Sequence, residues 1–93
     1  MSNLKDQNCP LCEQKATFNF GNFALDKYFN CPTCTQYIIS TMAEEKLKSL
    51  SSSVRENLSK MAKNSPELHA LLIRLKGTEI ESIYITRLEA NHQ

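Results

Sequence analysis

The spacing of hydrophobic residues in the first part of this 93-residue chain predicts β-strands. Apolar and polar residues alternate over 16–20 (Ala-Thr-Phe-Asn-Phe), a period-two pattern typical of a half-buried strand. Residues 21–22 (Gly-Asn) indicate a turn, and residues 28–30 (Tyr-Phe-Asn) lead back as a second strand. The aromatic and β-branched run at residues 37–39 (Tyr-Ile-Ile) predicts a short third strand.

From residue 41 the pattern changes and predicts two short helices. Thr41 and Glu44 have the spacing of a capping box, as do Ser53 and Glu56, and each pair marks a helix start. Apolar residues then recur at helical spacing: Ala43, Leu47 and Leu50 in the first segment, and Val54, Leu58, Met61 and Ala62 in the second. Pro66 ends the second helix. We expect these two faces to pack on the third strand or on each other.

Residues 66–88 are compatible with two structures. Leucines at helical spacing favour a helix over 66–75 followed by a strand, whereas the β-branched residues of 79–86 need a neighbouring strand to satisfy their backbone. We favour a β-hairpin over 66–88, followed by a tail at 89–93.

The expected hairpin turns at residues 76–77. A two-residue loop there would place Arg74 opposite Glu79 and Ile73 opposite Ile80. The register would therefore bring together one charge pair and one β-branched pair.

Composition indicates a single folded domain. Hydrophobic residues make up 41% of the chain and charged residues 23%, which is ordinary for a globular protein. A chain this short buries a thin core and commonly depends on a metal for stability. No apolar run is long enough to span a membrane, and residues 1–8 lack the apolar region of an export signal. We therefore expect a cytoplasmic protein with reduced thiols.

Two Cys-Pro-x-Cys motifs carry the strongest chemical signal in the chain. Cys9 and Cys12 form the first pair, and Cys31 and Cys34 form the second, with eighteen residues between the two pairs. Proline stiffens each turn, and a hairpin between the pairs would bring four soft thiolates into a tetrahedron suited to zinc. We expect one structural Zn²⁺ per chain. Two other roles for the cysteines are less favoured: a pair of disulfides would need an oxidising compartment, and a redox dithiol would not need a duplicated motif. Iron is a chemically possible alternative to zinc.

Residues 9–39 resemble the zinc-ribbon family, in which Cys-Pro-x-Cys motifs hold the metal. In many ribbons a glycine follows the second cysteine of each motif, whereas Glu13 and Thr35 occupy those positions here. The approach Tyr-Phe-Asn-Cys at 28–31 and the helix expected after Ile39 also resemble ribbon-plus-helix segments of bacterial proteins of uncertain role, some of them in defence or mobile-element contexts.

The expected fold is a small α+β zinc ribbon. A three-stranded antiparallel sheet would occupy residues 1–40, two short helices would follow over 41–65, and a C-terminal β-hairpin would complete one compact domain.

Charge and motif content favour a binding module over an enzyme. The net charge of +1 is the sum of +2 from residues 40–65 and −1 from residues 66–93, and the ribbon residues 1–39 are neutral and have no basic stripe. We find no phosphate-binding loop, dinucleotide fingerprint or activated nucleophile. A protein partner is the preferred expectation, with Phe23 and Tyr84 as candidate contact residues. The alternative is a nucleic-acid-binding ribbon that would use Lys46, Lys60 and Lys63. The sequence leaves the oligomeric state open.

Overall fold

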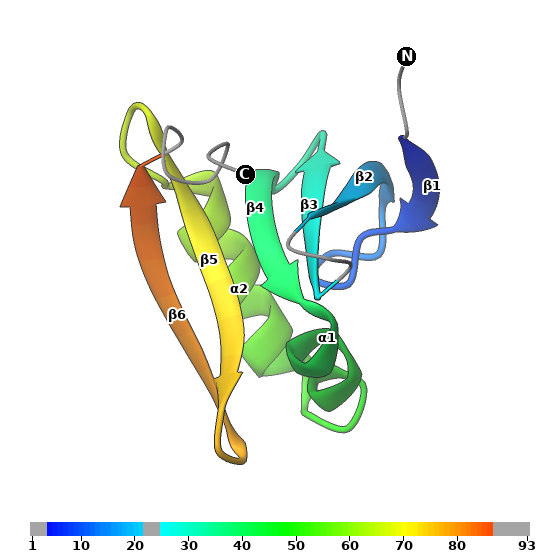
Figure 1. The fold of residues 1–93 in the computed structure, drawn as a ribbon, viewed down its shortest axis with the longest axis vertical. Helices are drawn as coiled ribbons and strands as arrows, with labels where there is room; N and C mark the ends of the chain where they lie inside the picture. Colours follow the sequence, from blue (N-terminus) through cyan, green and yellow to red (C-terminus); the bar gives the residue numbers. More distant parts are fainter. Residues whose placement is uncertain (1–3, 22–24, 87–93) are drawn as a thin grey trace.

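The computed structural model describes residues 4–21 and 25–86 and contains one six-stranded sheet whose strand order follows the chain (Figure 1). Neighbouring strands are antiparallel except β4 and β5, which are parallel and are connected through both helices. The strands are β1 (Lys5–Asn8), β2 (Lys15–Gly21), β3 (Asp26–Cys31), β4 (Thr35–Ser40), β5 (His69–Lys76) and β6 (Glu79–Thr86). The helices are α1 (Thr41–Leu47) and α2 (Ser52–Lys63).

The predicted fold, a three-stranded ribbon with a separate helical pair and hairpin, is wrong. Strand β4 pairs with β5, with Tyr37 opposite Leu71 and Ile39 opposite Ile73, so the C-terminal strands extend the sheet of the N-terminal ones. The sheet also contains a strand that was not predicted, β1, which precedes the first cysteine and pairs with β2. The physical reason lies in the consecutive apolar residues of β4 and β5. Ile38 and Ile39 are both buried although they point to opposite faces, as expected for central strands covered on both sides.

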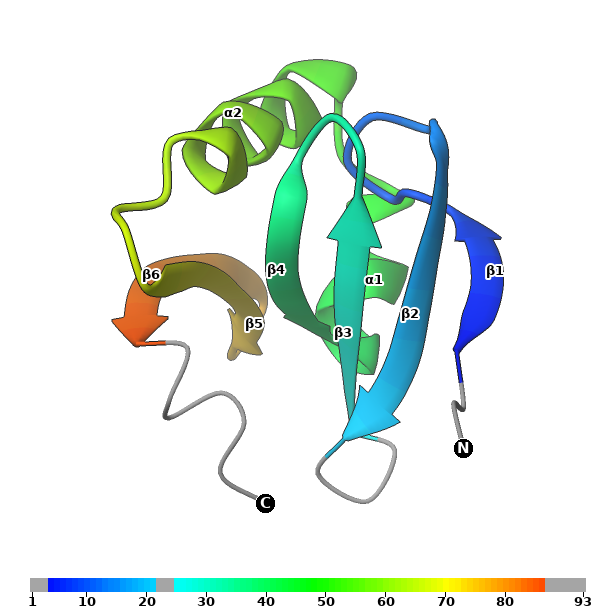
Figure 2. The same cartoon turned by 90° about the horizontal axis from the view of Figure 1, so that it is seen from above.

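The main core lies between the curved sheet and the two helices, which pack against β4 and β5 (Figure 2). Three aromatic rings cross β2, β3 and β4 in a row: Phe18 and Phe29 have ring centroids 5.1 Å apart, and Phe29 stacks on Tyr37 at 5.3 Å. The core cluster also contains aliphatic residues of β4, β5 and both helices: Ile39, Ala43, Leu47, Leu58, Ala62, Leu71 and Ile73. Among the described residues, no helix has the length and apolar character needed to cross a bilayer.

Helix α1 is held at its start by a different residue from the one predicted. Ser40 is the N-cap, and its hydroxyl oxygen accepts a hydrogen bond from the Ala43 N–H at 3.1 Å. Glu44 does not complete a capping box. Its carboxylate is buried and forms an ion pair with Lys27 of β3 at 2.8 Å and a hydrogen bond with the Gln7 amide of β1. This polar cluster, in which Lys27 also donates to Gln7, joins α1 to two strands.

The β5–β6 turn uses residues 77–78, and its register differs by two residues from the predicted one. Lys76 pairs with Glu79, and Arg74 pairs with Glu81, to which it donates a charge-assisted hydrogen bond of 2.8 Å. Gly77 has φ +64° and is the first central residue of the turn. A type II′ hairpin turn requires glycine at this position, and this requirement sets the register.

Candidate metal site

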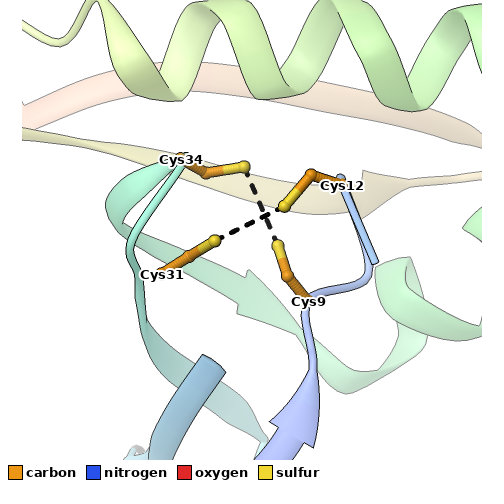
Figure 3. Close-up of side chains that lie close together, drawn as sticks. All are labelled: Cys9, Cys12, Cys31 and Cys34. Atoms are coloured by element: carbon orange, nitrogen blue, oxygen red, sulfur yellow. Dashed lines mark hydrogen bonds between the residues drawn. The ribbon is translucent and has the colours of Figure 1, made fainter. Parts of the chain in front are cut away.

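The four cysteine sulfurs converge at one end of the β2–β3–β4 segment (Figure 3). All four lie within 4.8 Å of one another; the Cys9 and Cys34 sulfurs are 3.8 Å apart, and those of Cys12 and Cys31 are 3.4 Å apart. None is in a disulfide. Zinc–sulfur bonds of about 2.3 Å in a tetrahedron place the sulfurs about 3.8 Å apart. The arrangement therefore fits a single metal ion bound by four thiolates.

Two matching turns bring the sulfurs together. The first follows β1 and is closed by backbone bonds from Cys9 N–H to the Gln14 carbonyl at 2.7 Å and from Glu13 N–H to the Cys9 carbonyl at 2.8 Å. Glu13 has φ +67° and Thr35, at the equivalent place in the second turn, has φ +66°. Both residues adopt the left-handed conformation that glycine adopts without strain. Each turn therefore has the positive φ that glycine usually provides, but with a non-glycine residue at that position.

Side chains outside the Cys-Pro-x-Cys motifs contact the sulfurs. The Tyr37 hydroxyl lies 2.9 Å from the Cys9 sulfur, and the Ser59 hydroxyl lies 3.0 Å from the Cys34 sulfur. Both Tyr37 and Ser59 are buried. When the cysteines are thiolates, these hydroxyls can act only as donors, and such bonds stabilise and orient metal ligands. Sequence analysis missed both residues; the one available signal was Ser59, a serine beside the apolar face of the second helix.

The second turn is also attached to α2. The Thr35 hydroxyl donates to the Ala62 carbonyl at 3.1 Å, close to the Ser59–Cys34 contact. Through these two contacts the metal site is connected to the helix layer as well as to the sheet. An ion bound here would therefore connect the β1–β2 turn, the β3–β4 turn and α2.

The thiols differ in their tendency to ionise. The hydrogen bond with Cys34 is the largest influence on Cys9 and, with the Tyr37 hydroxyl, lowers the Cys9 pKa to about 5 against the opposing effect of burial. The same bond to Cys9, together with burial, raises the pKa of Cys34, and burial raises that of Cys12. Burial and the negative charge on Cys9 also raise the pKa of Tyr37, which therefore keeps its proton. Further thiolates accumulate here only with a cation to neutralise them.

The other predicted site residues do not gather at the metal site. Tyr84 is 38% exposed on β6, and its hydroxyl donates to the Met61 carbonyl at 2.8 Å. Phe23 lies outside the described residues. Lys60 and Lys63, together with Arg55, line a hollow of about 520 Å³ beside Cys12, between α2 and the first cysteine turn. Two acidic residues, Glu13 and Glu56, line the same hollow, whereas Lys46 is on α1 and does not.

Comparison of the chain with protein-family models, with curated protein sequences and with solved structures found no significant match.

Proposed function

We propose that this protein binds one structural Zn²⁺ through Cys9, Cys12, Cys31 and Cys34. The observation that carries this proposal is the convergence of four free sulfurs at separations close to the edges of a zinc–thiolate tetrahedron. Four thiolates are soft ligands that suit zinc, and they leave no coordination position for water or substrate. The ion would stabilise the fold and would not take part in catalysis.

The test is the metal content of protein purified in reducing buffer. We expect one zinc per chain by mass spectrometry of metals, and less than about a tenth of that in Cys31→Ser, because three ligands bind zinc far more weakly than four. Ser49→Ala, which alters an exposed hydroxyl on the α1–α2 connection, is the control and should retain one zinc. Stoichiometric iron with the visible absorption of iron–thiolate centres, or two disulfides in place of a metal, would contradict the proposal.

We further propose that the zinc-stabilised domain acts as a protein-interaction module. Support comes from the C-terminal strand, where Ile83 and Tyr84 are large hydrophobic residues with 40% and 38% of their surface exposed. Nucleic-acid binding is less well supported, because the three basic residues that line the hollow beside Cys12 share it with two glutamates and leave a net charge of only +1; the basic residues are Arg55, Lys60 and Lys63.

A further inference from the structure

Strand β6 is a long edge of the sheet without the features that normally protect edges. It has eight residues in unbroken register with β5, and no described strand pairs with its outer side. It contains no lysine, proline or bulge, and its two charges, Glu79 and Glu81, are both near the turn. The opposite edge, β1, has only four residues, and two of them, Lys5 and Asp6, are charged. Proteins usually shorten, charge or cover their edges to prevent strand addition, so the open β6 edge is a site for a partner strand.

The register shows which backbone groups of β6 are available. A two-residue loop makes Lys76 and Glu79 the first hydrogen-bonded pair of the hairpin, and such pairs alternate along an antiparallel ladder. Ile83 and Ile85 therefore direct their N–H and C=O groups toward β5. Ser82 and Tyr84 direct theirs outward, where a further strand would bind.

We infer that the strand added to this edge is β6 of a second copy of the chain, in antiparallel orientation with Tyr84 on the two-fold axis. This register places Tyr84 opposite Tyr84 of the second copy. It also places Ile83 opposite Ile85 of the second copy, and the two-fold symmetry makes this isoleucine pair occur twice. Aromatic and β-branched cross-strand pairs are among the most favourable, and like charges directly opposite are unfavourable. Glu79 and Glu81 fall beyond the end of the other β6 in this register, so no acidic side chains oppose each other within the paired strands. The segment can therefore pair with a second copy of itself through its outward backbone groups, without like charges opposite each other.

The inference deepens the proposed interaction role by naming the partner, and it does not depend on the identity of the metal. An interface built from one strand per subunit is small, so we expect a reversible dimer at concentrations between about 10 µM and 1 mM.

Sedimentation equilibrium of the reduced, metal-loaded protein tests the dimer. We expect Ile83→Lys to weaken association by at least about tenfold, because it inserts a charge into both symmetry-related isoleucine pairs. Thr78→Lys is the matched control, since it adds the same charge to the turn of the same hairpin, outside the paired segment. Its dimerisation should equal that of the wild type. Far-ultraviolet circular dichroism and metal content, measured on each variant, separate a failure of this inference from a failure of the proposed zinc site.

Amide hydrogen exchange tests the register. As the protein concentration increases, exchange of the Tyr84 amide should slow, whereas the Ile83 and Ile85 amides, already bonded to β5, should change little. A wild-type protein that stays monomeric up to about 1 mM would overturn the inference. So would a dimer that Ile83→Lys leaves intact, or concentration-dependent protection confined to β1.

Discussion

The left-handed conformation of Glu13 predicts that glycine at this position stabilises the protein. An L-residue in this conformation costs about 1–2 kcal/mol, and the Glu13 side chain is exposed, with φ +67°. Glycine removes this cost, but it also gives the unfolded chain more conformational freedom, and this offsets roughly 0.5–1 kcal/mol of the gain in stability. Glu13→Ala removes the same charge and retains the backbone cost. We therefore expect Glu13→Gly to exceed Glu13→Ala by about 1 kcal/mol in free energy of unfolding.

Denaturant unfolding at a fixed excess of zinc measures this difference, and thermal melting should show about 4–8 °C between the two variants. Thr35 provides an internal comparison because it has φ +66° but also donates to the Ala62 carbonyl. Thr35→Gly should relieve the backbone and lose a hydrogen bond of about 1 kcal/mol, leaving stability nearly unchanged. If Glu13→Gly were no more stable than Glu13→Ala, the assigned turn geometry would be refuted.

Three further predictions follow from the site and the surface. Tyr37→Phe should weaken zinc binding about 10–100-fold in a chelator competition, because it removes the hydroxyl beside the Cys9 sulfur. Tyr84→Phe removes a hydroxyl remote from the sulfurs and should leave zinc affinity unchanged, so equal affinities of the two variants would contradict the role assigned to Tyr37. Zinc affinity should decrease as the pH falls from about 8 to about 6, because protons compete with zinc for thiols such as Cys34, whose pKa is raised. More than one proton should be released per zinc bound, and an affinity independent of pH would contradict this prediction. Replacing Lys46, Lys60 and Lys63 together with glutamate should leave partner binding in a pull-down largely unchanged. If the wild-type protein instead binds DNA or RNA in a salt-sensitive way in a gel shift, and the triple variant does not, the nucleic-acid alternative is favoured.

The cysteine cluster could be predicted from sequence because its signal is local. Each Cys-Pro-x-Cys turn places two sulfurs close together through a few residues, and the convergence of the two turns requires only the hairpin between them. The supporting hydroxyl of Ser59 could not be predicted in the same way. It reaches Cys34 only because α2 packs over the second turn, a contact between residues 25 positions apart.

The sheet was mispredicted because its decisive contact is not local. The parallel pairing of Tyr37 with Leu71 joins segments separated by two helices, and no turn signal marks it. A usable signal was present in the consecutive apolar residues 37–39 and 70–73, which suit strands buried on both faces. Strand β1 gave almost no signal, since its four residues are polar and owe their extended structure to pairing with β2.

X-ray absorption at the zinc edge tests the central claim most directly, because it counts and identifies the atoms bound to the metal. For protein purified with its native metal, we expect four sulfur neighbours at about 2.3 Å and no nitrogen or oxygen neighbour. Cys12→Ser should lose most of its zinc, and any zinc that it retains should have three sulfur neighbours, since Cys12 is one of the four converging ligands. A first shell with nitrogen or oxygen, or fewer than four sulfurs in the wild-type protein, would contradict the account.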